Sequence, residues 1–291
     1  MAFHNPALLN ADMHARVNLV FQDLYAGIST FHVAAAYDYQ PWKTRLAFGI
    51  HYLDYGRIPQ TDASGNVSGE FRPVDWVMQV SAARTYLEKW DYGATLKFIH
   101  SGYGVYRSSG VALDVGVLYR DTARLFTASV LARNMGFQLR RYLGTDPDDL
   151  PFDLQIGLTQ RLAHAPFSFS LTAQRVHQWD IRYNDTVFNN NNGIEDGGRK
   201  FTFDKLFRHV VLAAKIHPSE QLEFSIGYNH LRRQELNVYN ASNGLNGFSL
   251  GVGVLLKKIQ IRYARAYYQN NTALNQFGLG LRLSDYFGLG R

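Results

Sequence analysis

The stretch that decides the fold is FSLGVGVLL, Phe248–Leu256, in which large apolar residues alternate with small ones. Successive side chains of an extended strand point to opposite faces. One face of this stretch is apolar and carries Phe248, Leu250, Val252, Val254 and Leu256. The other face carries Ser249, Gly251 and Gly253. We assign the first face to lipid and the second to the lumen of a barrel.

The same period of two recurs along the whole chain and predicts about 14 strands, most of them about 8 to 12 residues long. A tilted strand that crosses a bilayer needs roughly 9 to 11 residues. The predicted strands are Val17–Gln22, Phe31–Tyr37, Leu46–Tyr52, Trp76–Arg84, Tyr92–His100, Val111–Tyr119, Leu125–Arg133, Phe152–Leu162, Phe167–Arg175, His209–Ile216, Leu222–His230, Phe248–Leu256, Ile259–Tyr267 and Leu274–Leu283.

The connections between these strands alternate in length. Joints from an even to an odd strand are short, such as Lys257-Lys258. Joints from an odd to an even strand are long, apart from the first at Tyr25–Ile28. The long ones are Asp54–Asp75, Ser101–Gly110, Asn134–Pro151, Val176–Arg208, Leu231–Gly247 and Tyr268–Ala273. Short turns on one rim and long loops on the other are typical of an all-β, antiparallel up-and-down outer-membrane barrel with its loops outside the cell.

Composition agrees with this class. The chain has 18 Tyr, 19 Phe, 25 Gly and no cysteine, so disulfides and thiolate metal sites are excluded. No apolar run approaches the roughly 20 residues of a membrane-spanning helix. The net charge of +6 comes from scattered Lys and Arg, which does not favour nucleic-acid binding. The start, Met1-Ala-Phe-His-Asn-Pro, lacks the features of a signal peptide and by itself favours the cytoplasm.

No motif predicts catalysis or a metal site. Gly247-Phe-Ser-Leu-Gly251 matches a nucleophile elbow, but Ser249 lies inside an alternating strand with no helix after it. The histidines show no metal-ligand spacing, and Asp146-Pro-Asp-Asp149 favours a solvated turn over a calcium loop. Asp114, on the polar face of its strand, predicts an ion pair inside the lumen. We therefore expect no enzyme activity and no cofactor.

Several segments resemble a known family. Asn5-Pro-Ala7, Ala112–Tyr119, Arg133–Gly136 and Leu150–Gly157 are similar to the FadL-type outer-membrane barrels. More specifically, Gln178–Tyr183, Asp204–His209 and Gly227–Arg233 resemble the PorQ-type barrels of the type IX secretion system. The resemblance implies one FadL-like barrel of 14 strands over residues 1–291, with residues 1–16 as the remnant of an N-terminal plug segment, made from a precursor with a leader.

The resemblance also implies a role. The barrel is expected to anchor a PorZ-like surface protein, in one complex with PorU and PorV, through its extracellular loops in the bacterial outer membrane. Val176–Arg208 is the first candidate for contact, because Trp, Tyr and Arg dominate interface energetics. The candidate partner-binding residues are Trp179, Arg182, Tyr183, Arg199, Arg232 and Arg233, which are equally suited to bracing the loops against the rim. The alternatives are a FadL-type transporter or binder of hydrophobic molecules and a soluble β-sandwich.

Overall fold

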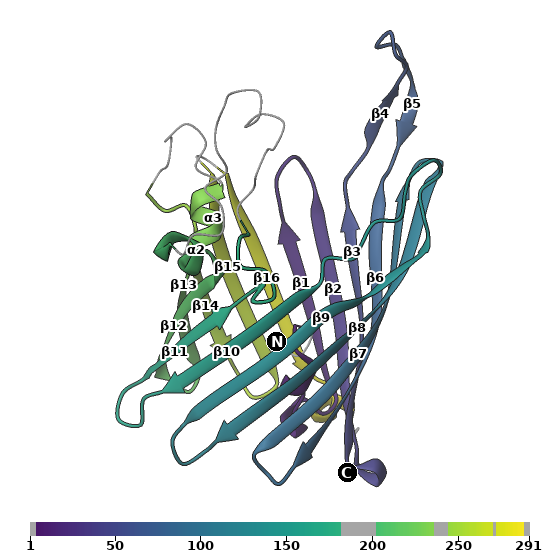
Figure 1. Ribbon diagram of the computed structural model, residues 1–291. Coiled ribbons are helices and arrows are strands. Elements are labelled where there is room, and N and C mark those ends of the chain that lie inside the picture. Colours follow the sequence, from purple (N-terminus) through teal and green to yellow (C-terminus); the bar gives the residue numbers. More distant parts are fainter. Residues whose placement is uncertain (1–3, 182–201, 236–243, 270–271, 288–291) are drawn as a thin grey trace.

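A closed antiparallel barrel of 14 strands dominates the structure, a computed structural model that describes residues 4–181, 202–235, 244–269 and 272–287 (Figure 1). Strands adjacent in the barrel are also consecutive in the chain, except at the β3–β6 pair and at the β1–β16 pair. β1 closes the ring by pairing with β16, from Arg16 opposite Arg282 to Asp23 opposite Asn275. The predicted up-and-down barrel of about 14 strands is confirmed.

The barrel strands are β1 (Arg16–Asp23), β2 (Ser29–Tyr39), β3 (Thr44–Asp54), β6 (Val74–Tyr86), β7 (Trp90–Tyr103), β8 (Tyr106–Asp121), β9 (Phe126–Arg140), β10 (Asp153–Arg161), β11 (Phe167–Ala173), β12 (Val210–Ser219), β13 (Leu222–Asn229), β14 (Phe248–Leu255), β15 (Ile259–Gln269) and β16 (Thr272–Arg282). The remaining elements are the hairpin β4 (Ile58–Thr61) and β5 (Val67–Phe71), the 3-10 helices η1 (Pro6–Leu8), η2 (Ala11–Met13) and η3 (Gln40–Trp42), and the helices α2 (Phe203–His209), α3 (His230–Glu235) and α4 (Ser284–Phe287).

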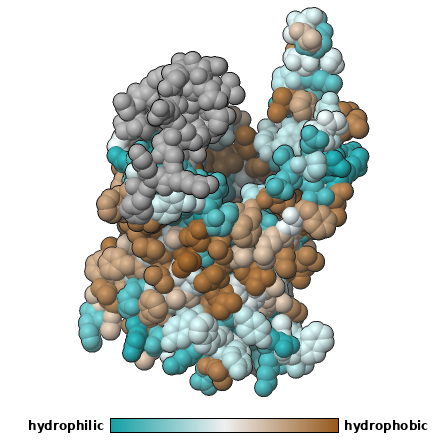
Figure 2. All heavy atoms as spheres, viewed as in Figure 1, coloured by the Kyte–Doolittle hydropathy of each residue, from teal (hydrophilic) through white to brown (hydrophobic). Residues whose placement is uncertain are grey.

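The two faces of the wall differ as the alternation predicts. In β7, exposed outward residues alternate with buried lumen residues, so that Leu96 is 60% exposed and its neighbour Lys97 only 5%. Every barrel strand contributes an exposed apolar side chain to the outer surface: Leu19, Val33, Phe48, Val80, Leu96, Val115, Val130, Leu158, Phe169, Leu212, Phe224, Leu250, Ile261 and Phe277. Figure 2 shows hydrophobic side chains gathered in a band across the visible face of the wall. Exposing an apolar belt of this size to water is unfavourable, whereas the hydrocarbon core of a bilayer is a favourable environment for it.

The short turns gather on one rim and the long connections on the other, but several predicted loops are partly strand. β7 continues to Tyr103 and β8 begins at Tyr106, so the region predicted as the loop Ser101–Gly110 is a hairpin turning at Gly104 and Val105. β9 likewise continues to Arg140. The extensions of β7 and β8 were missed because their residues do not alternate between apolar and polar. The extension of β9 was missed because the exposed apolar residues change along it from an even position, Val130, to odd positions, Phe137 and Leu139.

The C-terminal end of the predicted loop Val176–Arg208 is helical. These residues belong to helix α2, which begins at Phe203. Phe203, Leu206 and Phe207 follow the i, i+3, i+4 spacing of one helical face, which a period-two interpretation overlooks. Within the described residues, no helix is long and apolar enough to cross a bilayer.

The wall is not equally high all round. β6 to β9 have 13 to 16 residues each, and we call this side the tall wall. β10 to β14 have 7 to 10 residues each and form the short wall. The β4–β5 hairpin continues upward on the tall side, and α2 and α3 lie above the short side (Figure 1).

Candidate functional site

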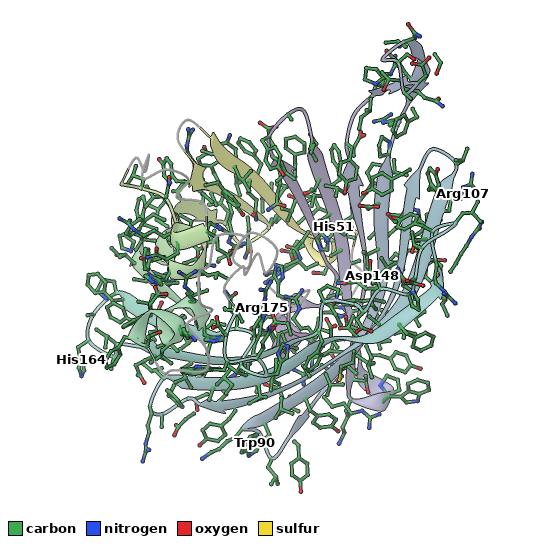
Figure 3. All side chains as sticks on the ribbon, turned by 45° about the horizontal axis from the view of Figure 1, so that its top comes forward. His51, Trp90, Arg107, Asp148, His164 and Arg175 are labelled. Carbon is green, nitrogen blue, oxygen red and sulfur yellow. The ribbon has the colours of Figure 1, made fainter. Side chains whose placement is uncertain are left out.

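Polar and small side chains line the lumen. Across β1, β15 and β16 the inward face carries Arg16, Asn18, Gln22, Gln260, Arg262, Gln276, Gly278 and Gly280. Gln22 Nε2 donates to Gln276 Oε1 at 2.8 Å, and Arg262 Nε donates to Glu223 Oε1 at 2.9 Å. Viewed from above, His51 points inward while Trp90 points away from the barrel (Figure 3). The lumen therefore offers hydrogen-bonding groups rather than a continuous apolar track.

A buried charge pair lies on the inner side of the tall wall. Lys97 Nζ is 2.5 Å from Asp114 Oδ2, and the two side chains are only 6% and 1% exposed. Lys97 also donates to Asn134 Oδ1 at 3.0 Å, and the backbone N–H of Asn134 donates to Asp114 Oδ1 at 2.8 Å. The predicted ion pair of Asp114 is confirmed. The sequence did not name its partner, because that depends on how β7 and β8 pair.

The same cluster holds a β-bulge in β9. Arg133 and Asn134 together lie opposite the single residue Asp114, and Asn134 has a φ of 56°. A bulge places one extra residue in one strand and bends it. At Gly136 an added Cβ would lie 2.7 Å from the Cα of Ala112, so the close approach of β8 and β9 here requires glycine.

The bulge marks the point where β9 loses its second neighbour. The ladder between β9 and β10 ends at Arg133 opposite Asp153, whereas β9 stays paired with β8 as far as Arg140. Asn134 Nδ2 donates to the carbonyl oxygen of Pro151 at 3.0 Å, which ties the chain before β10 to this point. From residue 134 to 140 one edge of β9 is therefore without a β10 partner, and we call this the wall break. The sequence did not predict the wall break, because a bulge of one extra residue has no repeating pattern by which it could be recognised.

The N-terminal segment lies inside the barrel near the rim of short turns. An added Cβ on Gly93 would meet the carbonyl carbon of Pro6 at 2.8 Å, and one on Gly116 would clash with Asn5 Oδ1. These two glycines of β7 and β8 form a seat for η1. Glycines at lumen-facing positions of these strands are the sequence signal from which this seat could have been predicted.

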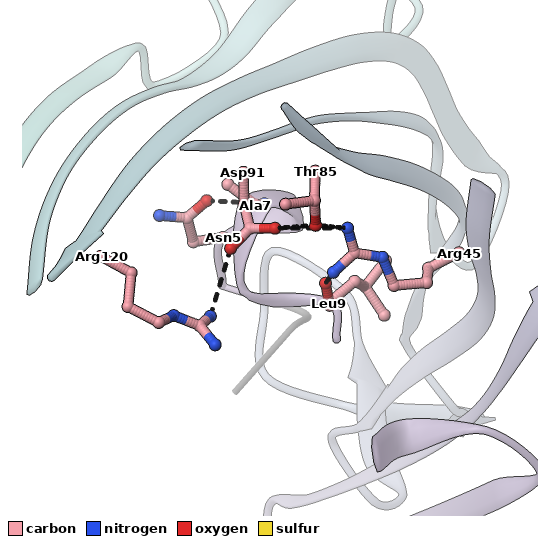
Figure 4. A network of polar contacts seen from close by, with 7 residues as sticks. All are labelled: Asn5, Ala7, Leu9, Arg45, Thr85, Asp91 and Arg120. Carbon is pink, nitrogen blue, oxygen red and sulfur yellow. Dashed lines mark hydrogen bonds and ion pairs between the residues drawn. The ribbon is translucent and has the colours of Figure 1, made fainter. Parts of the chain in front are cut away.

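Charged side chains fix the segment above this seat (Figure 4). Arg45 donates to the carbonyl oxygen of Leu9 at 2.7 Å and lies 3.2 Å from Asp91 Oδ1. Asp91 also accepts from Thr85 Oγ1 at 2.5 Å and pairs with Arg120 at 3.2 Å. Asp91 thus links its own strand β7 to β3, β6 and β8, and Arg45 connects this network to the inserted segment.

The candidate partner-binding residues fall into two groups. Arg182, Tyr183 and Arg199 lie outside the described residues. Trp179 is 40% exposed, and its ring stacks on His209 with centroids 6.1 Å apart. Arg232 lies over the ring of Tyr268 at 4.0 Å, and Arg233 donates to the carbonyl oxygen of Gly244 at 3.1 Å. These contacts hold the loops against the rim, which is the alternative to partner binding that the sequence analysis gives for these residues.

Helix α2 is held to the rim by two buried polar side chains, Lys205 and His209. Lys205, 3% exposed, pairs with Asp180 at 2.8 Å. The ring nitrogens of His209 lie 2.8 and 3.1 Å from the carbonyl oxygens of Gln174 and Trp179. At the start of α2, burial opposes ionisation of Asp204, but hydrogen bonds from Arg208 and His230 hold the pKa of that carboxyl below its usual value.

Within the described residues, the motifs that suggest chemistry do not assemble a reactive site. Ser249 is the second residue of β14, opposite Gly227 and on the lumen side of the wall. Among the described residues, no three histidine or acidic side chains form a group that could hold a metal ion.

The closed barrel, its outward apolar belt and its sorted connections together define an integral β-barrel of the bacterial outer membrane. No family model matches the chain, and no curated protein sequence matches it.

Solved structures with this fold include two forms of one channel. The ΔS2S3 mutant of the TodX monoaromatic hydrocarbon channel is 10% identical with a TM-score of 0.51, over 96% of this chain and 92% of that one. The ΔS2 mutant of TodX gives 10% and 0.50, over 95% and 91%. The outer membrane protein Omp33 from Acinetobacter baumannii is 8% identical with a TM-score of 0.46, over 93% and 99%. The likeness to TodX confirms the FadL-like fold that the resemblance predicts.

Proposed function

We propose that this barrel is an outer-membrane channel for small hydrophobic molecules, which enter it sideways from the lipid through the wall break. The observation that carries the proposal is the bulge at Asn134, beyond which β9 has no β10 partner. The fold likeness to a monoaromatic hydrocarbon channel supports the same class of cargo.

The surroundings of the break suit an apolar molecule. Phe137 and Leu139 on the unpaired part of β9 are 62% and 55% exposed, and Phe152, just before β10, is 37% exposed. A hydrophobic compound dissolved in the outer leaflet meets these side chains without first crossing a layer of water. The polar lumen beyond them favours brief passage of a small molecule over storage of a long acyl chain.

The test removes the bulge. Deleting Asn134 leaves Arg133 alone opposite Asp114 and allows a regular ladder, whereas Asn134→Gly keeps the backbone bulge because glycine accepts a positive φ. We expect toluene uptake by cells or proteoliposomes to fall toward the level without protein for the deletion, and to persist for Asn134→Gly. Equal uptake by the deletion variant and the wild type, with both folded, would rule out entry at this break.

A second proposal is that the barrel also anchors a surface partner, in the manner of the PorQ-type barrels it resembles. The β4–β5 hairpin favours it, since this hairpin projects beyond the rim with Val67 66% and Ile58 39% exposed (Figure 1). With Arg232 and Arg233 engaged in the rim, Trp179 and this hairpin become the first candidates for contact with a PorZ-like protein in a complex with PorU and PorV.

Replacing residues 58–71 with a short turn tests this second role. We expect the PorZ-like protein to be lost from the affinity-purified barrel, while toluene uptake is unchanged. Undiminished recovery of PorZ, PorU and PorV with the shortened barrel would exclude the hairpin as the anchor.

A further inference from the structure

Two adjoining apolar grooves cross the outer surface of the short wall. The first, about 570 Å³, runs over β11 to β15, and its apolar lining includes Phe169, Ile226 and Leu250. The second, about 590 Å³, shares Phe169 and Ile226 and extends over β10. Volumes of this size lie within the range of small-molecule sites. All of these side chains face outward, so the grooves open to lipid and not to the lumen.

A small residue accounts for the hollow. Ala214 of β12 pairs with Ile226 on one side and Phe169 on the other, and it lines both grooves. Between these bulky neighbours an alanine leaves a depression that a larger side chain would fill. The depression continues upward through Tyr228, which lies 4.8 Å from Phe248 and 6.2 Å from His230 between ring centroids.

Helix α2 extends the same surface toward the outside of the cell. The ring of Phe207 lies 6.1 Å from that of His230. Phe203, Leu206 and Phe207 are 71%, 39% and 50% exposed. Helix α2 thus continues the apolar outer surface above the short wall, where the barrel strands are shortest.

One cation interrupts this apolar surface. Arg265 of β15 lines the first groove in its extracellular half, faces outward beside Leu250 and is exposed. Its guanidinium lies 5.6 Å from the centre of the Tyr267 ring. Its side chain makes no hydrogen bond or ion pair in the described part of the chain. An arginine on the lipid-facing wall is costly unless an anion compensates its charge.

We infer that the short wall binds a phosphate-bearing lipid of the outer leaflet, with its acyl chains in the two grooves and its phosphate at Arg265. The grooves are continuous with the lipid-facing belt, so acyl chains are the occupants already in contact with it. The charge of Arg265 selects an anionic head group, because guanidinium forms charge-assisted hydrogen bonds with phosphate. This site is separate from the lumen and the wall break.

The experiment measures lipid retention on the purified full-length barrel by native mass spectrometry. The probes are dioleoyl phosphatidic acid, dioleoylglycerol with the same chains but no phosphate, and inorganic phosphate as a competitor. Arg265→Gln removes the cation, and Ala214→Phe fills the hollow. Arg107→Gln, an outward arginine on the opposite wall (Figure 3), and Ala82→Phe, on the outer face of β6, are the matched controls.

We expect Arg265→Gln to weaken retention of phosphatidic acid about tenfold while leaving dioleoylglycerol unchanged. Ala214→Phe is expected to weaken both lipids, and neither control to weaken either. Retention by Arg265→Gln equal to the wild type, or an equal loss in Arg107→Gln, would overturn the site. Displacement of the lipid by millimolar inorganic phosphate would reduce it to a simple anion site and overturn the lipid assignment. Migration on unheated gels verifies that each variant is folded.

Discussion

Lys97 and Asp114 face each other across neighbouring strands at a place where neither reaches water. Their attraction offsets the cost of removing two charges from water only because Asn134 supplies further hydrogen bonds to both. Removing one partner leaves the other charge buried and uncompensated.

Lys97→Met is therefore expected to destabilise the barrel by about 3 to 5 kcal/mol, and adding Asp114→Asn to recover part of that loss. Urea unfolding in lipid vesicles, followed by tryptophan fluorescence, measures both. Lys215→Met is the control, because Lys215 lies 3.8 Å from Glu223 and is 30% exposed, so its loss should cost at most about 1 kcal/mol. Equal costs for the two lysine variants would show that burial of the Lys97 pair is not decisive.

The position of the N-terminal segment depends on two glycines, which have no side chain to fill the space that the segment occupies. η1 lies against β7 and β8 where Gly93 and Gly116 leave room for it. Because this contact closes part of the lumen, we propose that residues 4–15 act as a plug.

Gly116→Val should drive the segment off its seat, because the added Cβ would clash with Asn5 and lie 3.4 Å from the Cβ of Ala7. We expect the barrel to fold, the segment to become cleavable by added protease, and the single-channel conductance to rise. Gly278→Val is the matched lumen control, with no atom closer than 3.7 Å to the added Cβ. Protease protection and conductance like those of the wild type would contradict the plug.

Helix α2 is the second element that long-range contacts hold in place, and Asp204 makes its attachment sensitive to pH. The pKa of Asp204 is lowered in the folded protein, so its contacts with Arg208 and His230 stabilise α2 above about pH 4, near the value for an unfolded Asp. That stabilisation is lost as the pH falls through the lowered folded-state value.

Since the chain has no cysteine, a spin label at Phe203→Cys reports on α2 alone. We expect the label to become mobile only on acidification below about pH 4, and to be mobile already at neutral pH when Asp204→Asn is added. If both proteins show the same pH profile, Asp204 is not the group that titrates.

For the molecule as a whole, the unequal height of the wall separates two kinds of surface. The tall wall carries the Lys97 pair, the bulge at Asn134 and the projecting β4–β5 hairpin (Figure 1). The short wall carries the apolar grooves, Arg265 and helix α2. A molecule that enters at the wall break and a lipid bound on the short wall therefore use different parts of the barrel, and variants in one are expected to leave the other intact.

The sequence by itself determined the class of this protein. Side-chain alternation is a local property of an extended chain, so Phe248–Leu256 alone separates a lipid face from a lumen face. Strand parity then assigns each connection to a rim, which placed the excursion after Val176 outside the cell. The extensions of β7 and β8 escaped this reasoning because their residues do not alternate, and that of β9 escaped it because the bulge shifts the alternation by one residue.

Only the tertiary structure decided which residues meet. The partner of Asp114, the seat at Gly93 and Gly116, and the groove at Ala214 depend on the register between strands, which no local pattern encodes. The bulge at Asn134 breaks the period of two that made the rest predictable. Helix α2 follows the helical period of about 3.6 residues and not the period of two. Its attachment to the rim depends on Asp180 and on backbone carbonyl groups that are distant in the chain. Contacts between residues distant in sequence therefore decided the candidate site, whereas the local pattern decided the barrel.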